Sequence, residues 1–166
     1  MTKANRAMLI GSIGAGKSTL TNALLERKIA AVKTQSLQYQ DWIVDTPGEY
    51  TENPLFYKNI MATALEVTHI LFLQDATKQK TIFPPGFSMG FNKLPIGVVT
   101  KSDAATAHIK QATAQLRRAV PKGPIVITSS VTGQGLAEIR ELVKCSSLEE
   151  MQEAMKAVPG DVVIFH

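Results

Sequence analysis

The sequence predicts an α/β fold in which a mostly parallel sheet carries helices on both faces. Short apolar runs alternate with helix-like stretches along the 166 residues. Each run is bounded by Gly, Pro or polar residues, which is typical of buried parallel strands. Polar motifs follow the runs, at the strand ends where sheets of this kind bind ligands. A hydrophobic content of 45% suits one folded domain with its own core.

The expected elements follow one another in regular order. Strands are expected at 7–11, 42–46, 68–76, 95–101 and 124–130. Helices are expected at 17–27, 54–66, 104–119 and 135–144. This alternation places helices on both faces of the sheet and predicts a three-layer domain.

The segment after Cys145 departs from the alternation. We expect residues 1–145 to form the main domain and residues 146–166 to form a C-terminal extension. Ser147 and the glutamate three positions later give the pattern of a capping box, and the chain closes with the strand-like run "PGDVVIFH". Two interpretations stay open: a helix and strand packed on the domain, or a targeting element whose removal preserves ligand binding.

Composition limits the partners and the location. A single cysteine rules out an intrachain disulfide framework and is expected to be a packed thiol. The 18 basic and 14 acidic residues are scattered and do not alternate with aromatics, so no nucleic acid is expected as a partner. No apolar run approaches the ~20 residues of a membrane span. A cytoplasmic location is therefore expected.

The segment "GSIGAGKS" (11–18) follows the first strand and opens a helix. Its small residues let successive backbone N–H groups surround phosphates, and the helix offers its positive N-terminal end. Lys17, expected to face solvent in the free protein, would reach the β- and γ-phosphates, and the Ser18 hydroxyl would bind Mg²⁺. The motif predicts a three-layer P-loop NTPase fold. The expected nucleotide contacts here are Gly11, Ser12, Ile13, Gly14, Ala15, Gly16, Lys17, Ser18 and Thr19.

The base is predicted by "TKSD" (100–103) at the end of the fourth predicted strand. The Asp103 carboxylate can accept the N1–H and the exocyclic amine of guanine, a pairing that adenine lacks. Lys101 would lay its aliphatic stem over the base. "TSSVTGQG" follows the next strand, where a backbone N–H can meet guanine O6. The expected base contacts are Thr100, Lys101, Asp103, Ser129, Ser130 and Val131.

"DTPG" (45–48) ends another predicted strand. Asp45 would bind Mg²⁺ through a water, and the Gly48 N–H would contact the γ-phosphate. Thr34 is the candidate for a switch threonine that meets Mg²⁺ in the triphosphate state. With Lys17 and Thr34, Glu49 completes the candidate catalytic set.

Glu49 stands where many GTP-hydrolysing proteins have a glutamine that orients the attacking water. An ionised carboxylate can only accept hydrogen bonds and repels an anionic phosphate. Glu49 is therefore expected to be a solvated residue that leaves hydrolysis slow, or else to act as a general base or bind through metal in a phosphoryl-transfer site. Ile13 stands where fast GTPases often have glycine, and its side chain can crowd the transition state.

The segments "KTQSLQYQDWIVDTPGEYTENPLFYKNI", "QDAT", "FPPGF" and "FNKLPIGVVTKSD" resemble the EutP/PduV family of ethanolamine- and propanediol-utilisation proteins, over residues 7–143. The resemblance implies a small GTPase-like protein associated with bacterial microcompartments, with GTP or GDP and Mg²⁺ as cofactors. A shell or cytoskeletal protein is the implied partner. It also brings an alternative, because acetate kinase activity has been ascribed to some members.

Three functions stay open at this stage: a guanine-nucleotide switch that hydrolyses GTP slowly, a kinase for a small carboxylate such as acetate, and a nucleotide-binding module without turnover. A kinase needs a cationic acceptor pocket beside the γ-phosphate. The arginines stand far from the motifs in sequence: Arg6, Arg27, Arg117, Arg118 and Arg140.

The loop at 77–91 carries a phenylalanine every four residues, which predicts either a small core under the loop or a docking surface.

Overall fold

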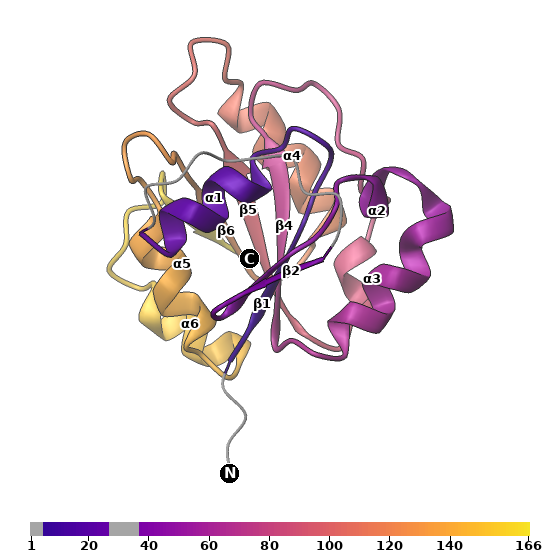
Figure 1. Cartoon of the computed structure of the whole chain (residues 1–166). Coiled ribbons are helices and arrows are strands. Elements are labelled where there is room, and N and C mark those ends of the chain that lie inside the picture. The colour runs from indigo at the N-terminus through magenta and orange to yellow at the C-terminus, as the bar shows by residue number, and fades with distance from the viewer. Residues whose placement is uncertain (1–4, 27–36) are drawn as a thin grey trace.

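A seven-stranded sheet forms the centre of the computed structural model, which describes residues 5–26 and 37–166 (Figure 1). The strand order is β2-β3-β1-β4-β5-β6-β7. The five inner strands are parallel, whereas the edge strands β2 and β7 pair antiparallel with β3 and β6. The strands are β1 (Ala7–Ile10), β2 (Gln38–Gln40), β3 (Ile43–Asp45), β4 (His69–Asp75), β5 (Leu94–Thr100), β6 (Pro124–Ile127) and β7 (Val163–Phe165).

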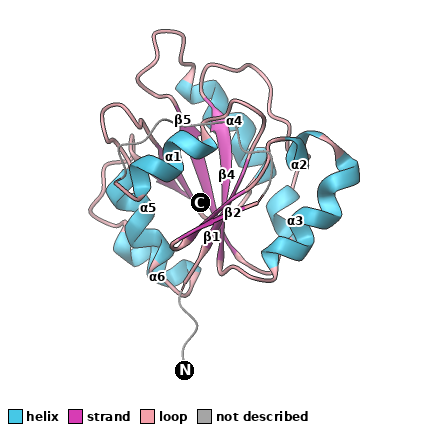
Figure 2. Cartoon of the chain, in the orientation of Figure 1, coloured by secondary structure: helices cyan, strands magenta, loops and turns pink. Residues whose placement is uncertain are grey.

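Helices cover both faces of the sheet, so the predicted α/β three-layer fold is confirmed (Figure 2). Side chains from α1, α5 and α6 join one buried cluster, and side chains from α3 and α4 join the other. The helices are α1 (Lys17–Leu24), α2 (Glu49–Glu52), α3 (Tyr57–Ala64), α4 (Ile109–Ala119), α5 (Leu136–Val143) and α6 (Leu148–Ala154). Short 3₁₀ turns lie at Pro54–Phe56 and Phe87–Gly90.

The apolar runs are continuous because the inner strands are buried on both faces. In β1, Ala7 and Leu9 belong to the first cluster, while Met8 and Ile10 belong to the second. This division follows from the two-residue period of a strand. All four side chains are fully buried. The strand ends are thereby fixed firmly enough to position the loops that leave them.

The start of one helix and the presence of one strand differ from the predictions. The helix expected from residue 104 begins at Ile109, because the chain first makes turns in which Ala104 N donates to Lys101 O (3.1 Å) and Ala107 N donates to Ala104 O (3.0 Å). The edge strand β2 was not predicted. Its three residues, "QYQ", have no apolar run, because an exposed edge strand does not need one.

The C-terminal segment adds a helix and a strand to this domain. Ser147 Oγ accepts from Glu150 N (3.1 Å), which confirms the predicted cap of α6. β7 pairs with β6, and Met151, Met155 and Val163 are buried in the first cluster. These contacts agree with packing on the domain. The division of the chain at residue 145 stays a prediction.

The phenylalanine loop forms a small core. Phe83, Phe87 and Phe91 surround Phe72 of β4, with ring centroids 5.7, 6.2 and 6.1 Å from that of Phe72. The interpretation as a core under the loop is therefore confirmed.

Cys145 is a buried free thiol, as expected. In the part of the chain that the structure describes, every helix is too short or too polar to cross a membrane.

Candidate functional site

The predicted motifs meet at one end of the sheet, where β1, β3, β4 and β5 end. The loop 11–16 connects β1 to α1, and Lys17 is the first residue of α1. Gly16 has a φ of 98°, a left-handed conformation that favours glycine. Ala15 N donates to Ser12 O (3.1 Å), which closes the turn. The loop thus opens directly into the N-terminus of α1, where anions bind favourably.

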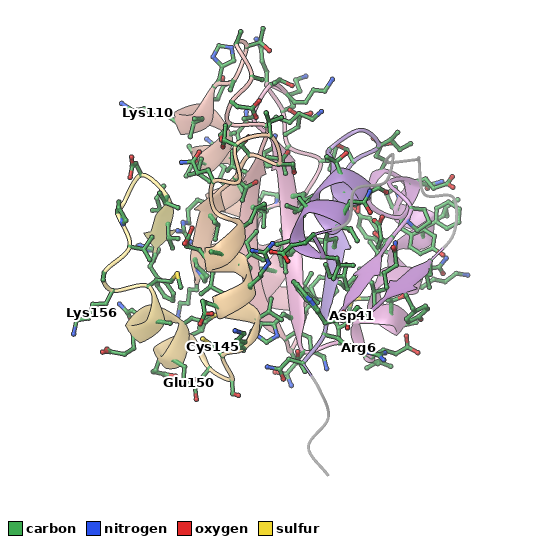
Figure 3. All side chains as sticks on the ribbon, turned by 60° about the vertical axis from the view of Figure 1, so that its left-hand side comes forward. Arg6, Asp41, Lys110, Cys145, Glu150 and Lys156 are labelled. Atoms are coloured by element: carbon green, nitrogen blue, oxygen red, sulfur yellow. The ribbon has the colours of Figure 1, made fainter. Side chains whose placement is uncertain are left out.

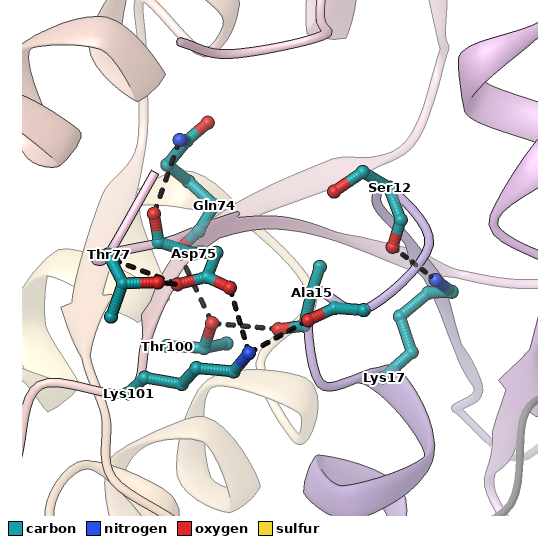
Figure 4. Close-up of polar contacts among 9 residues, drawn as sticks. Ser12, Ala15, Lys17, Gln74, Asp75, Thr77, Thr100 and Lys101 are labelled. Atoms are coloured by element: carbon teal, nitrogen blue, oxygen red, sulfur yellow. Dashed lines mark hydrogen bonds and ion pairs between the residues drawn. The ribbon is translucent and has the colours of Figure 1, made fainter. Parts of the chain in front are cut away.

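Lys17 is held by the loop itself. Its Nζ donates to Ser12 O (2.9 Å) (Figure 4) and to Gly11 O (3.0 Å). The residue is 7% exposed. Burial lowers the pKa of Lys17, although Asp45 and Glu52 counteract this. The expectation of a solvent-facing lysine is therefore wrong. The carbonyl oxygens of the loop draw the ammonium group inward.

Ser18 and Asp45, the two predicted metal ligands that lie within the described residues, contact each other. Ser18 Oγ donates to Asp45 Oδ2 (2.7 Å), and Asp45 is fully buried at the end of β3. Thr46 Oγ1 donates to Leu9 O (2.7 Å) and fixes this strand end to β1. A hydroxyl and a carboxylate suit Mg²⁺, which takes its other ligands from water and phosphates. The described residues contain no group of three or more His, Cys, Asp or Glu able to hold a metal. Thr34 lies outside the described residues.

Lys101 links the predicted base motif to the phosphate loop. It has a φ of 62°, and its Nζ donates to Gly14 O (2.8 Å) and to Asp75 Oδ2 (2.8 Å) (Figure 4). Thr100 Oγ1 donates to Ala15 O (2.8 Å), which makes a second link. The end of β5 is thus bonded to the loop at two points, and Lys101 also connects it to the end of β4.

Asp75 anchors Lys101. It lies at the end of β4 and is 2% exposed, and it accepts from Thr77 N (2.8 Å) and Thr77 Oγ1 (2.6 Å). Burial opposes ionisation of Asp75, but hydrogen bonds from Lys101 and Thr77 outweigh it and hold its pKa below the ordinary value. An ionised Asp75 therefore pairs with Lys101.

Asp103 and the loop after β6 are joined by Ser129. The Ser129 Oγ donates to Asp103 Oδ1 (2.7 Å) and accepts from Val131 N (3.1 Å) and Thr132 N (3.0 Å). Ser129 is buried, whereas the Asp103 side chain is exposed and Val131 is 82% exposed. Ser130 is half-buried between them. The two predicted base-contacting segments therefore share one hydrogen-bond network.

The segment after β3 packs directly against the phosphate loop. A Cβ added at Gly48 would lie 2.5 Å from Ile13 N and 2.6 Å from Ile13 Cα, so only glycine fits. Ile13 is 41% exposed. Glu49 begins α2 and is exposed, and among the described residues its carboxylate makes no hydrogen bond or ion pair. Glu52 ends α2, and its Oε1 accepts from Ile13 N (3.2 Å).

The described arginines contribute nothing to the phosphate loop. Arg117 donates to Gly123 O (2.8 Å) and Ile164 O (2.9 Å), and Arg140 donates to Leu24 O (3.0 Å). Arg6 precedes β1 at the other end of the sheet, far from Lys110 at the start of α4 (Figure 3). Within residues 5–26 and 37–166, no hydrogen bond or ion pair joins an arginine to the loop.

Sequence reasoning missed two acidic residues at this site. Asp75 stands in "QDAT" as the last residue of β4, a buried strand that lies beside β1. A carboxylate at the end of a buried parallel strand was the available signal. Glu52 carried no such signal, because its contact with Ile13 depends on how α2 folds back over the loop.

Comparison with known proteins identifies the family. The sequence profile of PduV-EutP, described as ethanolamine utilisation and propanediol utilisation, matches residues 4–145. The chain is 38% identical over 101 residues to the propanediol utilization protein PduV of Citrobacter freundii, covering 61% of this chain and 67% of that one. It is 30% identical over 151 residues to the probable acetate kinase EutP of Escherichia coli K12, covering 90% and 94%.

Solved structures agree with the fold. Era of Aquifex aeolicus bound to GDP and AlF4⁻ superposes with a TM-score of 0.60 at 23% identity, covering 86% of this chain. Era bound to MgGDPNP and a segment of 16S ribosomal RNA gives a TM-score of 0.60 at 24% identity, covering 87% of this chain. This chain spans 57% of the length of each Era chain. The fold is that of P-loop GTPases, and the chain belongs to the PduV-EutP family of ethanolamine- and propanediol-utilisation proteins.

Proposed function

We propose that this protein binds guanine nucleotide with Mg²⁺ and hydrolyses GTP slowly, as a switch in ethanolamine or propanediol utilisation. One observation carries the proposal: the phosphate loop, the Ser18–Asp45 pair and the Lys101–Asp103 segment meet at one end of the sheet. Phosphate, metal and base groups of a single nucleotide require this convergence.

The phosphate loop holds the phosphates. Its N–H groups and the N-terminus of α1 surround them, and Lys17 leaves its two carbonyl partners for phosphate oxygens. Such an exchange is favourable because a charge-assisted bond to an anion is stronger than a bond to a neutral carbonyl. Gly48 supplies an N–H to the γ-phosphate.

Mg²⁺ fits between Ser18 and Asp45. The Ser18 hydroxyl would bind it directly and Asp45 through a water, and Thr34 would add a ligand in the triphosphate state. When bound, the ion neutralises charge on the β- and γ-phosphates. Asp45 is held ready by its bond with Ser18.

Guanine is recognised by Asp103, with Lys101 beneath the base. Ser129 holds one oxygen of Asp103 and also orders the backbone of the loop at 129–132. The loop then presents an N–H to guanine O6. Because Lys101 also bonds to Gly14 O, binding of the base and binding of the phosphates are mechanically linked.

Asp75→Asn tests that link. The asparagine keeps an oxygen for Thr77 but loses the charge that pairs with Lys101. We expect GDP affinity to fall roughly tenfold, the effect of weakening one partly buried charge-assisted bond. Titration with a fluorescent GDP analogue measures this, with Asp161→Asn, an exposed aspartate near the C-terminus, as the control. An unchanged affinity for GDP would contradict the assigned role of Asp75.

Slow hydrolysis follows from Glu49. Its exposed carboxylate makes no hydrogen bond or ion pair within the described residues, so no described contact prepares it as a base. Its charge opposes approach to the γ-phosphate. The water that attacks is therefore poorly oriented, and hydrolysis is limited by the lack of a two-sided hydrogen-bonding group.

Glu49→Gln is expected to raise the single-turnover rate of GTP hydrolysis about tenfold, which corresponds to about 1.4 kcal/mol in the barrier. GTP affinity should stay the same, because the nucleotide contacts are untouched. Ile13→Gly combined with Glu49→Gln should exceed either change alone, since the half-exposed Ile13 packs against Gly48, the residue before Glu49, and its side chain can crowd the transition state. A fall of ~10²-fold in rate would instead make Glu49 a general base.

Acetate kinase activity is the second candidate. About nine tenths of this chain aligns with relatives that carry the name probable acetate kinase (90% and 89%). A kinase of this kind would pass the γ-phosphoryl group to a carboxylate, which needs a cation to bind it. Arg117 and Arg140 are bonded away from the phosphate loop, and no described arginine forms a hydrogen bond or ion pair with it, which weighs against this candidate. A nucleotide-binding module without turnover is the third, if Ile13 and Glu49 together block hydrolysis.

We place the protein in the cytoplasm, at or in a bacterial microcompartment, on the strength of its family. Its partner there would be a shell or cytoskeletal protein. The RNA in one of the Era structures belongs to that protein, and we propose no nucleic-acid partner for this chain.

A further inference from the structure

The carboxylate of Glu52 is bonded to the phosphate loop. Its Oε1 accepts from the backbone N–H of Ile13 at 3.2 Å. A carboxylate oxygen that accepts a loop N–H has the same charge and the same acceptor role as a phosphate oxygen. Glu52 therefore makes, from within the chain, the type of contact that a nucleotide phosphate makes with such a loop.

The contact lies on the γ-phosphate side of the loop. Gly48, whose N–H is assigned to the γ-phosphate, packs against the backbone of Ile13 with no room for a Cβ. α2 connects Gly48 to Glu52 in a single turn, with Glu52 N donating to Gly48 O (3.2 Å). The two residues approach Ile13 together. Any anion that enters beside Gly48 must therefore face the Glu52 carboxylate.

The charges around Lys17 also disfavour a γ-phosphate beside Glu52. Burial is the main cause that lowers the pKa of Lys17, and the nearby carboxylates of Asp45 and Glu52 are what raise it again. Two carboxylates thus already lie near the one buried ammonium of the loop. A diphosphate adds its charge on the α1 side, whereas a γ-phosphate adds charge next to Glu52, where like charges repel.

Glu52 can leave at low cost. It is exposed and is the last residue of a four-residue helix, so rotation of its side chain requires no unfolding of the core. An exposed carboxylate regains water when it leaves, which limits the penalty to the loss of one hydrogen bond and the rotamer change. The contact therefore adjusts affinity and does not block the site.

We propose that Glu52 is a specificity residue of the nucleotide site: its carboxylate competes with the γ-phosphate at the Ile13 amide and so biases the site toward the nucleoside diphosphate. This inference rests on the proposed nucleotide function and deepens it. It assigns to the chain itself a preference for GDP over GTP. It also predicts that the Glu52 side chain rotates away from the Ile13 amide when a triphosphate binds.

The test compares Glu52→Gln and Glu52→Ala with the unchanged protein and with Glu149→Gln, a control carboxylate that is exposed in the first turn of α6. Fluorescence titration gives the dissociation constants of GDP and of a non-hydrolysable GTP analogue, with Mg²⁺ and with EDTA. In both Glu52 variants we expect GTP-analogue affinity relative to GDP to rise about tenfold, the order for removing one unit charge at a partly solvated site. The control should leave the ratio unchanged.

The outcomes separate this inference from the proposed function. An unchanged ratio in both Glu52 variants, with GDP still bound, overturns the inference alone. If the Glu52 variants bind the GTP analogue more weakly than the unchanged protein, and only when Mg²⁺ is present, the inference is also overturned, because Glu52 would then be a metal ligand. If the unchanged protein binds neither guanine nucleotide, the proposed function fails and this inference with it. Faster amide hydrogen exchange at Ile13 in Glu52→Ala, without nucleotide, is expected as a second readout.

Discussion

Asp103→Asn is expected to weaken GDP binding by about a hundredfold or more and to admit xanthosine diphosphate. The carboxylate accepts two hydrogen bonds from guanine, and an amide replaces one of those acceptors with a donor. Xanthine carries an oxygen where guanine has its amine, so it pairs with that donor. Sites built on polar pairing can discriminate between bases by ~10⁴ or more.

The fold should tolerate this change. Asparagine keeps an oxygen that can accept from Ser129 Oγ, the one side-chain contact of Asp103 in the described structure. Titrations with GDP, ADP and xanthosine diphosphate measure the selectivity, with Asp161→Asn as the control. Equal affinities for GDP and ADP in the unchanged protein would remove the guanine assignment and favour the kinase.

Lys17→Ala is expected to weaken GTP binding by at least about a hundredfold. Lys17 supplies the one buried ammonium of the loop, and bonds from charged groups to phosphates contribute about 1.5–3 kcal/mol each. The melting temperature should change little. The loss of bonds to Gly11 O and Ser12 O is offset because a desolvated charge is also removed.

Calorimetry for GTP and thermal unfolding for the fold check this result together. Lys156→Ala is the matched control, because Lys156 follows α6 and is exposed (Figure 3). Its one ion pair among the described residues is with the exposed Glu153 (3.8 Å). Normal GTP affinity in Lys17→Ala with an unchanged melting temperature would show that the loop does not bind phosphate.

The sequence predicted the inner sheet well because burial on both faces leaves a continuous apolar signal. Each of the five inner strands fell on its expected run, and Ser147 marked the start of α6. The edge strand β2 left no such signal, since a strand at the margin of the sheet can be polar. The start of α4 was placed too early because Lys101 and the turns after it take up the first residues of the segment.

The site was predicted as far as local motifs describe it. Lys17, Ser18, Asp45 and Asp103 lie at or after the ends of the strands where their motifs were expected, and their binding roles stay predictions. The contact between Ser18 and Asp45 and that between Asp103 and Ser129 join distant segments. The inward position of Lys17 depends on two carbonyls whose direction the sequence does not reveal. Contacts such as these arise from the folded loop and not from residue spacing.

Asp75 shows the same limit over a longer range. Its partner Lys101 is brought to it by the pairing of β4 with β5, in which Asp75 lies opposite Thr100. Acidic residues at strand ends are common. The pairing of Asp75 with Thr100 places its carboxylate beside Lys101, which is a predicted base contact. Thr34, by contrast, lies outside the described residues, and its role stays a prediction.

Product analysis after incubation with Mg²⁺ and either GTP or ATP, with and without acetate, tests the central claim most directly. A slow GTPase predicts GDP and inorganic phosphate from GTP, little product from ATP, and no effect of acetate. Lys17→Ala should yield neither product, which controls for contaminating hydrolases. Formation of acetyl phosphate in the presence of acetate, with release of inorganic phosphate suppressed, would contradict the account and make the protein a kinase.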